Sequence, residues 1–314
     1  MNYLKDYREG EKFVGTYLCK QKQILKTKAG KTYYSLTLQD KTGTADGKIW
    51  ELNNGIANFE PMDYIHCEGM VTSFQGNLQM NISRVRISDE GEYDPADYVP
   101  CTNKDVGEMF SRILKYVASV QNKYLRKILE MYFVENKEFV DAFKKHSAAK
   151  SVHHGFMGGL LEHTLSVTDM CQYFAEHYPM IHRDLLITAA LFHDMGKIQE
   201  ISDFPMNDYT DDGQLLGHIY IGARCKENAA AQIPNFPPKL KNELVHCILA
   251  HHGKMEFGSP KVPAIMEAMA LHMADNADAK LQTLTEVFTQ AGDNMGWLGF
   301  NRMFESNLRK TSEE

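Results

Sequence analysis

The sequence lacks the features of a membrane or secreted protein. No apolar run reaches the ~18 residues that a membrane span needs, and the N-terminal segment Met1–Glu9 carries too many charges for a signal peptide. The six cysteines contain no Cys-x-x-Cys pair, which argues against a disulfide framework and a structural zinc site. We therefore expect a cytoplasmic protein with reduced cysteines and no membrane partner.

A positive net charge is also missing. The chain of 314 residues has a formal net charge of −7, so it has no general attraction for nucleic acid, and any polyanion must be held by a local patch or by metal. Domains commonly span about 100–200 residues, so this length allows two domains with separate cores. The sequence does not set the number of subunits, and a homo-oligomer is compatible with it.

The segment Leu191–Lys197 places a histidine and an aspartate, His193 and Asp194, at the end of an apolar run. The run 185–192 predicts a buried helix, and Gly196 supplies the backbone freedom that commonly ends one. Burying two neutral polar groups without partners costs roughly 2–7 kcal/mol each, and a carboxylate costs more. A divalent cation would supply a partner, so the pair is a candidate metal centre. For the dipeptide alone, a solvated or ion-paired pair is the commoner explanation.

Other histidines strengthen the metal interpretation. His163 lies on the apolar face of a predicted helix, with Leu160 and Val167 at three- and four-residue spacing. A single such histidine is usually a core residue bonded to a carbonyl, but several in separate helices favour a shared site. Imidazole and carboxylate groups together bind Mn, Fe, Co, Ni or Zn. Further segments that predict helices supply three more candidate ligands, His218, His251 and Asp275.

Residues 12–90 predict a β-barrel domain. The stretch Lys31–Leu38 alternates between apolar and polar positions, as a half-buried strand does. Five strands with a helix between the third and fourth is the layout of an OB-fold barrel. The strands after the first two are expected near 48–50, 64–71 and 78–87, with a short helical insert at 52–59.

The first part of this barrel has a window without acidic residues. Between Lys12 and Gln39 the chain carries six lysines and no aspartate or glutamate, which is our candidate for a local basic patch. Such barrels bind single strands by stacking bases on aromatic rings and following phosphates with cations. A lysine-rich hairpin on a barrel that contacts only protein is the alternative, and Trp50 fits the core equally well. The predicted nucleic-acid contacts are Lys20, Lys22, Lys26, Lys28, Lys31, Tyr33 and Phe74.

The character of the chain changes after the barrel. Residues 91–103 carry acids and prolines without periodicity and predict an interdomain linker. From 104 to 314 apolar residues recur at helical spacing, and the metal candidates fall within 163–279. The longest interruption, 202–214, lies between two ligand segments, where it would border the mouth of the site. We therefore expect an α+β multidomain protein, with a five-stranded OB-type β-barrel followed by an all-helical domain.

The order of these elements carries a family resemblance. Gly-Gly-Leu-Leu-Glu-His ending at His163, His-Asp-Met-Gly-Lys starting at His193, and Ala-Asp-Asn around Asp275 resemble the HD superfamily of metal-dependent phosphohydrolases. With the barrel in front, nearly the whole chain resembles the YhaM-type 3′–5′ exoribonucleases. This resemblance implies an intracellular enzyme that removes nucleotides from the 3′ end of RNA and single-stranded DNA.

The same resemblance implies the metal ligands. Two divalent ions per chain are expected, with Mn²⁺ favoured and Co²⁺, Fe²⁺, Ni²⁺ or Zn²⁺ as alternatives. Asp194 would be shared by the two ions and so take part in catalysis. His218 and His251 look like ligands of the second ion. The primary ligands would be His163, His193, Asp194 and Asp275.

Four nearby residues allow two interpretations each. Lys197 either contacts a non-bridging phosphate oxygen during catalysis or is an exposed lysine favoured by the helix dipole. His153 and His154 either contact substrate or lie on the surface. His252 is either a substrate contact or the metal ligand in place of His251, because both follow Ile248 within about one helical turn.

Two other functions stay open at this stage. A nucleotide or cyclic-dinucleotide phosphohydrolase would use the same metal site on a small molecule. The Gly-Tyr-Pro element of the cyclic-dinucleotide branch is absent after His252, which weighs against that branch. A non-catalytic single-strand-binding protein would keep the helical domain for structure alone, but a site without activity would be free to lose its ligands.

Overall fold

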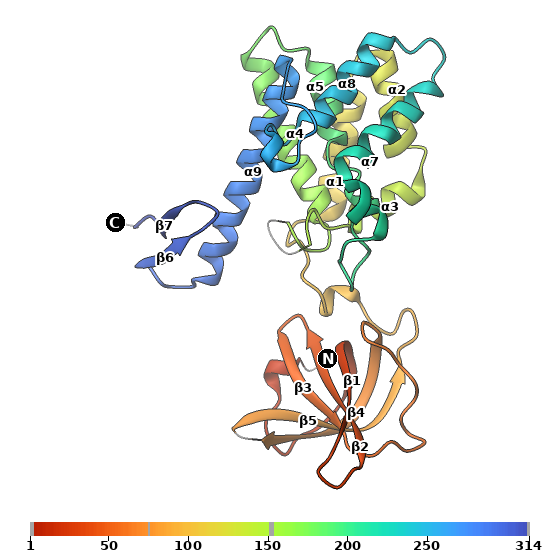
Figure 1. Cartoon of the computed structure of the whole chain (residues 1–314), viewed down its shortest axis with the longest axis vertical. Helices are drawn as coiled ribbons and strands as arrows, with labels where there is room; N and C mark the ends of the chain where they lie inside the picture. The colour runs from red at the N-terminus through yellow and green to blue at the C-terminus, as the bar shows by residue number, and fades with distance from the viewer. Residues whose placement is uncertain (1–2, 75, 151–153, 313–314) are drawn as a thin grey trace. The chain divides into compact units, whose positions relative to one another are not determined.

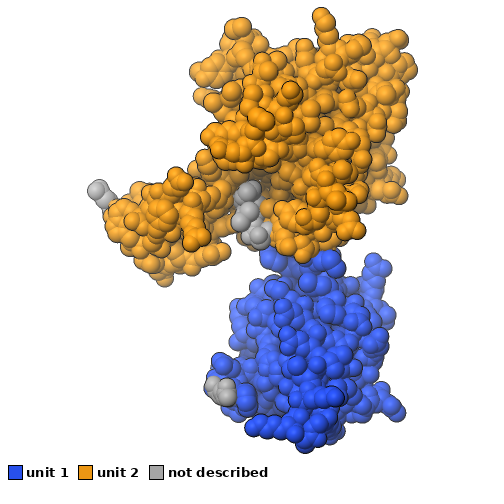
Figure 2. Space-filling model, in the orientation of Figure 1, with its two compact units in different colours: residues 1–101, 204–206 blue, residues 102–203, 207–314 orange. Residues whose placement is uncertain are grey.

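A computed structural model describes residues 3–74, 76–150 and 154–312 of the chain. The fold divides into two compact units, which Figure 2 shows in different colours. Unit 1 comprises Met1–Cys101 with Phe204–Met206, and unit 2 comprises Thr102–Asp203 with Asn207–Glu314. Each unit has its own cluster of buried apolar side chains.

Unit 1 is a closed barrel of five strands in the order β1-β2-β3-β5-β4, with β1 also paired to β4 (Figure 1). The β3–β5 pair is parallel and the other pairs are antiparallel. A five-stranded Greek-key barrel of this kind is an OB fold, as the sequence predicted. The strands are β1 (Lys12–Lys26), β2 (Thr32–Asp40), β3 (Gly43–Ile49), β4 (Tyr64–Phe74) and β5 (Asn77–Ile87).

Buried apolar residues alternate with partly exposed polar residues along β2, and the apolar ones line the barrel core. Leu36 and Leu38 are buried, whereas the alternating residues Ser35 and Thr37 are partly exposed. This is the period-two pattern of a strand with one face on the core. The core they join also contains Phe13 of β1.

The predicted helix at 52–59 is wrong, because this segment forms turns between β3 and β4. The side chain of Asn53 accepts a hydrogen bond from the backbone N–H of Gly55 at 2.8 Å. Ile56 then pairs in parallel with Val85 of β5. Asparagine and glycine favour such local turns over a helix, and the pairing of Ile56 adds a partner that a helix would lose.

The segment predicted as a linker packs on the barrel over much of its length. The Tyr93 ring stacks on the Tyr64 ring with centroids 4.0 Å apart, and Val99 is buried. Lys41 donates a hydrogen bond to Asp97 at 2.7 Å. A short 3₁₀ helix, η2 (Pro95–Asp97), lies in this segment, and another, η1 (Leu4–Asp6), precedes β1. The separate roles assigned to the barrel and to the helical domain stay predictions.

Unit 2 is built from helices, as the sequence predicted, but it ends in a hairpin. The helical structure predicted up to the C-terminus ends with the last helix, α9 (Met266–Gln290). After it, Gly292 and Gly299 adopt positive φ angles of 53° and 95°, conformations that favour glycine. The hairpin is β6 (Trp297–Asn301) and β7 (Ser306–Arg309). The helices are α1 (Val106–Ser119), α2 (Lys123–Phe133), α3 (Lys137–Lys145), α4 (Gly159–His177), α5 (Arg183–Phe192), α6 (Lys197–Glu200), α7 (Asp211–Ala231), α8 (Pro238–Ala250), η3 (Met255–Phe257) and α9 (Met266–Gln290).

The central helix of unit 2 is α5, which packs on α2, α4, α8 and α9 (Figure 1). Its residues Leu185–Phe192 are all buried, as the apolar run predicted. The ring of His182 caps its first turn by accepting a hydrogen bond from the Leu185 N–H at 3.1 Å. None of the described helices combines the length and the apolar character needed to cross a membrane, and all six cysteines are free thiols.

Gly196 is needed for a reason that differs from the prediction. Its φ of −63° is right-handed, so backbone freedom is not what the position requires. A Cβ at this position would lie 2.1 Å from the carbonyl oxygen of His218. Glycine therefore lets α6 approach α7 closely, which brings the segment after α5 next to His218.

Candidate metal centre

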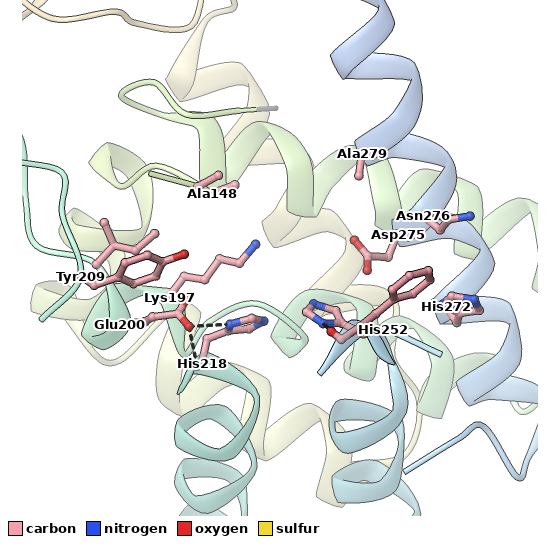
Figure 3. Close-up of a pocket in the computed structure, with 13 residues that line it drawn as sticks. Ala148, Lys197, Glu200, Tyr209, His218, His252, His272, Asp275, Asn276 and Ala279 are labelled. Carbon is pink, nitrogen blue, oxygen red and sulfur yellow. Dashed lines mark hydrogen bonds and ion pairs between the residues drawn. The ribbon is translucent and has the colours of Figure 1, made fainter. Parts of the chain in front are cut away.

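Unit 2 contains a pocket of about 470 Å³ into which side chains from three helices and from the segment after α8 point (Figure 3). Lys197 comes from α6, His218 from α7 and Asp275 from α9, and His252 follows the end of α8. Tyr209 of the loop before α7 also lines the pocket. The prediction that this loop borders the site is confirmed at Tyr209, although α7 already begins at Asp211.

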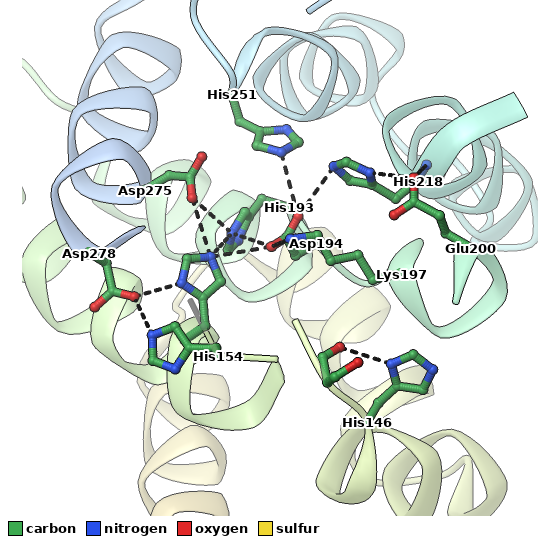
Figure 4. A network of polar contacts seen from close by, with 12 residues as sticks. His146, His154, His193, Asp194, Lys197, Glu200, His218, His251, Asp275 and Asp278 are labelled. Carbon is green, nitrogen blue, oxygen red and sulfur yellow. Dashed lines mark hydrogen bonds and ion pairs between the residues drawn. The ribbon is translucent and has the colours of Figure 1, made fainter. Parts of the chain in front are cut away.

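Asp194 lies beneath this pocket, in the turn after α5, and its two oxygens face different histidines (Figure 4). Its Oδ2 atom is 3.2 Å from Nε2 of His163 and 3.4 Å from Nε2 of His193. Oδ1 of Asp275 is also 3.2 Å from Nε2 of His163. The nitrogen and oxygen atoms of His163, His193 and Asp275 lie within 4.8 Å of one another, and we call these three residues with Asp194 Oδ2 the first ligand set.

The other oxygen of Asp194 faces the second ligand set. Its Oδ1 atom is 3.5 Å from Nε2 of His218 and 3.6 Å from Nε2 of His251. Ligand atoms of His218, His251 and His252 all lie within 4.8 Å of one another. We call these three histidines with Asp194 Oδ1 the second ligand set, and which of His251 and His252 binds an ion stays a prediction.

The ring nitrogens on the far side of the four central histidines are already occupied. A proton on each Nδ1 leaves the Nε2 lone pair facing Asp194, which is the tautomer a metal ligand needs. The Nδ1 partners are Asp278 for His163 at 2.7 Å, the Ala190 carbonyl for His193 at 2.7 Å, Glu200 for His218 at 2.9 Å, and the Ile248 carbonyl for His251 at 2.6 Å.

The centre contains buried polar atoms that protein groups do not satisfy. Within the described part of the chain, Nε2 of His218 and Nε2 of His251 have no hydrogen-bond partner, and neither oxygen of Asp194 has a hydrogen bond of good geometry. Leaving such groups unpaired costs roughly 2–7 kcal/mol for each neutral one. Divalent cations would satisfy these atoms, and a nitrogen and oxygen donor set without sulfur suits Mn, Fe, Co, Ni or Zn.

The electrostatics of the centre keep its carboxylates charged. Burial raises the pKa of the Asp194 carboxyl, but Lys197 and His193 outweigh that effect and hold the pKa well below its usual range. Burial also raises the pKa of Asp275, and the hydrogen bond from His163 more than reverses the shift. Burial lowers the pKa of His251. Burial also lowers the pKa of His163, but its hydrogen bonds to Asp194, Asp275 and Asp278 outweigh that effect and raise the pKa well above its ordinary value. Near neutral pH the centre therefore offers carboxylates and, at His251, a neutral imidazole, whereas a cation that binds His163 would displace a proton from it.

Lys197 is not the exposed lysine at a helix C-terminus that one interpretation described. It is the first residue of α6, its side chain is 12% exposed, and its Nζ atom lies 2.7 Å from Oδ2 of Asp194. Burial lowers the pKa of Lys197, but Asp194 raises it further. The ammonium group therefore stays charged at the floor of the pocket.

Of the two candidate histidines that precede α4, the structure describes only His154. His154 is buried, and its Nε2 atom lies 2.9 Å from Oδ2 of Asp278. The interpretation of His154 as a surface residue is therefore wrong, because its ring is enclosed behind the first ligand set, whereas its contact with substrate stays a prediction. His153 lies outside the described residues.

Two carboxylates of the centre, Asp278 and Glu200, were missed by the sequence analysis. Asp278 follows Asp275 by three residues on α9, and Glu200 follows Lys197 by three residues on α6. That spacing puts each on the same helix face as a pocket residue, which is the signal that was available. Their histidine partners are distant in the sequence, so the pairing itself was not visible.

Most of the predicted nucleic-acid contacts of unit 1 are accessible to solvent, but one lysine is bound to another part of the barrel. Tyr33 stacks on Trp50 with centroids 4.6 Å apart, and Trp50 is 39% exposed, so it is not a core residue. Phe74 is 61% exposed at the end of β4. Lys22 differs, because its side chain is 8% exposed and its ammonium donates to the Phe59 carbonyl at 2.5 Å. The remaining predicted lysines, Lys20, Lys26, Lys28 and Lys31, are exposed.

Comparison with known proteins places the helical unit in a family. The HD domain model matches residues 160–280, which contain both ligand sets. The 3′-5′ exoribonuclease YhaM of Geobacillus sp. (strain WCH70) is 32% identical over 257 residues, which cover 81% of this chain and 78% of that protein. YhaM of Bacillus subtilis (strain 168) is 32% identical over 81% of each chain. YhaM of Shouchella clausii (strain KSM-K16) is 32% identical over 90% of this chain and 88% of that protein.

A solved structure also aligns with part of the chain. It is the second OB-fold domain of replication protein A from Methanococcus maripaludis, at 20% identity and a TM-score of 0.24. The alignment covers 29% of this chain and 98% of that one. The OB fold of unit 1 is defined here by its own strand order.

Proposed function

Because the chain belongs to the family of YhaM 3′–5′ exoribonucleases, we propose that its two ligand sets hold two divalent ions around Asp194. As a member, the chain is a metal-dependent 3′–5′ exoribonuclease with an HD domain. The number and identity of the ions, and the residues that act on the strand, are our proposal. Its main support is the position of Asp194, whose two oxygens face separate groups of histidines.

Each ligand set would hold one ion, with Mn²⁺ favoured. When bound, two such ions lower the pKa of a water molecule towards neutrality and neutralise charge on the phosphoryl oxygens. Asp194 contributes one oxygen to each set, so it would fix the two sets relative to each other. Asp278 and Glu200 hold His163 and His218 in the ligand tautomer.

Lys197 is the residue best placed to contact the phosphodiester. Its ammonium lies beside Asp194 and lines the pocket. We infer that it donates a hydrogen bond to a non-bridging oxygen of the scissile phosphate while the bond to the 3′ oxygen breaks. Because Asp194 keeps this lysine charged, the contact would strengthen as negative charge develops.

Unit 1 would hold the strand that unit 2 shortens. The stacked pair of partly buried Tyr33 and exposed Trp50 offers an aromatic face for bases, and exposed Phe74 offers a further one. The lysines proposed to follow phosphates are Lys20, Lys26, Lys28 and Lys31, without Lys22. Stacking and cationic contacts of this kind do not distinguish RNA from DNA, so we propose that single-stranded DNA is also a substrate.

The direction of degradation tests this function. RNA labelled at its 5′ end should yield a ladder of progressively shorter labelled products in the presence of Mn²⁺, whereas RNA labelled in its 3′-terminal nucleotide should release the label as a mononucleotide at once. Chelation of the metal should stop both. Release of label from the 5′ end, or hydrolysis of free nucleotides or cyclic dinucleotides without shortening of RNA, would contradict the proposal. Binding of the strand without any cleavage would favour the non-catalytic alternative.

A further inference from the structure

Two exposed aromatic side chains line the pocket above the metal centre. Tyr209 is 46% exposed and Phe257 is 54% exposed, although each contributes to the pocket wall. Figure 3 shows Tyr209 beside Lys197 and Glu200, with His252 on the side of Asp275. Large aromatic rings that are left in water where they line a pocket are candidates for contact with an aromatic ligand.

The backbone beside each ring is hydrogen-bonded to residues of the metal centre. Thr210, next to Tyr209, donates its N–H to the carbonyl of Glu200 at 2.9 Å, and Glu200 holds His218. The carbonyl of Phe257 accepts a hydrogen bond from Nδ1 of His252 at 2.8 Å. These contacts fix the backbone from which each ring extends, so both rings start from defined points beside the metal centre.

Each ring also has a lysine close to its face. Nζ of Lys150 lies 5.8 Å from the Tyr209 centroid, and Nζ of Lys254 lies 5.2 Å from the Phe257 centroid. Both lysines also pair with an acid, Asp208 and Glu256 respectively, so their charge is partly neutralised. Aromatic rings with adjoining cations are the usual elements of single-strand binding sites.

The space beside these rings suits unpaired nucleotides. Three alanines, Ala148, Ala149 and Ala279, line the same pocket and leave room next to the aromatic rings. The volume of about 470 Å³ lies within the range of about 300–1,000 Å³ for sites that enclose a small ligand. A base can lie against a protein ring only when it has left its own stack, which is easiest in a single strand.

We propose that Tyr209 and Phe257 stack on the bases at the 3′ end of the substrate and so place the scissile phosphodiester over the metal centre. This inference rests on the proposed function and adds its positioning residues. The enzyme would select a free, unpaired 3′ end through these two rings, while Lys197 and the ligand sets act on the phosphate. Neither ring takes part in the bond-breaking step.

The test compares 5′-labelled RNA with two matched strands, one lacking the last base and one lacking the base before it. Tyr209→Ala and Phe257→Ala should each lower kcat/KM for removal of the first nucleotide by about 5- to 150-fold on the complete strand, as expected for one lost stack. On one of the two abasic strands, each variant should have the same kcat/KM as wild type. That strand lacks the base on which the replaced ring would stack, so wild type cannot make the contact either. Tyr209→Phe and Phe257→Tyr should keep most of the activity.

Matched controls are exposed aromatics that do not line the pocket. Tyr173 of α4 and Phe300 of β6 are 61% and 66% exposed, and their alanine variants should behave as wild type on all three strands. Equal losses on complete and abasic strands would assign Tyr209 and Phe257 a structural role and overturn the proposal, as would unchanged kcat/KM. If wild type itself removes no nucleotide from the 3′ end, the proposed function fails and this inference fails with it.

Discussion

Oδ2 of Asp278 lies 2.7 Å from Nδ1 of His163, on the side of the ring that faces away from Asp194. The same oxygen lies 2.9 Å from Nε2 of His154, and the other oxygen accepts a hydrogen bond from Ser166. Burial raises the pKa of this carboxyl, but hydrogen bonds from His154 and His163 hold it well below the usual range. A charged carboxylate thus fixes the orientation and tautomer of a first-set ligand.

Replacing Asp278 with asparagine removes this charge while nearly keeping the side-chain volume. Loss of a carboxylate behind a ligating histidine weakens metal affinity or activity by about 10- to 100-fold. We therefore expect Asp278→Asn to move the midpoint of Mn²⁺-dependent activity to a higher concentration by that factor. Asp293→Asn, an exposed position after α9, is the control. An unchanged midpoint for Asp278→Asn would show that the contact is dispensable.

Asp194→Asn should remove hydrolysis and keep strand binding. The amide cannot place an anionic oxygen in each ligand set, so several kcal/mol of charge stabilisation is lost, about a thousand-fold in rate or more. Binding to a single strand, measured by fluorescence anisotropy, should stay near the wild-type value because unit 1 is unaltered. Asp203→Asn, at an exposed position outside the pocket, serves as the control. Activity within a few-fold of wild type would remove Asp194 from the mechanism.

Salt dependence distinguishes the exposed lysines of the barrel from Lys22. Each phosphate contact to a single strand contributes about −0.7 to the slope of log K against log salt. Lys26→Gln and Lys28→Gln should each make this slope shallower by about that amount in equilibrium binding experiments. Lys22→Gln should leave the slope unchanged, because the Lys22 ammonium already donates to the Phe59 carbonyl. A shallower slope for Lys22→Gln would contradict this assignment.

Lys226 places a buried amino group where the proposed chemistry does not use it. Its Nζ atom lies 3.3 Å from the Tyr132 centroid and 3.7 Å from the Phe192 centroid, and it has no hydrogen-bond partner among the described residues. Burial lowers its pKa well below the ordinary lysine value. A desolvated cation–π contact is worth about 2 kcal/mol, less than the several kcal/mol that removing an ammonium from water costs.

Lys226→Met should therefore raise the free energy of unfolding by about 1–3 kcal/mol near neutral pH, the cost of an unsatisfied buried group. A lowered pKa in the folded state means that the unfolded chain binds the proton more tightly, so wild type loses stability as pH falls below the ordinary lysine pKa of about 10.4. The gain from Lys226→Met should shrink towards that pH. Urea unfolding at pH 7 and pH 9.5 measures the difference, with exposed Lys239→Met as the control. Destabilisation at both pH values would show that the ammonium stabilises the fold.

The sequence predicts the centre well where a polar residue interrupts an apolar pattern. His163 and the pair His193 and Asp194 stand out because they occupy positions that helical spacing assigns to the core. Asp278 and Glu200 do not stand out, since a carboxylate three residues from another polar residue looks like a solvated helix face. Only the approach of α9 to α4, and of α6 to α7, shows that these carboxylates face histidines.

The barrel shows a different limit of sequence patterns. A β-bulge shifts the pairing of β1 with β2 between Cys19 and Gln21, so Lys22 pairs with Leu36 and turns towards the core side. A shift of one residue moves every later side chain to the opposite face. No residue type in β1 predicts this bulge, so the sequence pattern placed all of the lysines in one basic patch. Likewise, the apolar spacing in 52–59 resembles a helix, and only the local turn at Asn53 decides against it.

The central claim is that the two ligand sets around Asp194 form one centre with two ions. Metal analysis of protein saturated with Mn²⁺, read together with RNA hydrolysis by the same samples, tests it most directly. Wild type should contain close to two ions per chain, and His218→Ala should contain close to one and lose most of its activity. A stoichiometry of one in wild type, with His218→Ala fully active, would contradict the account.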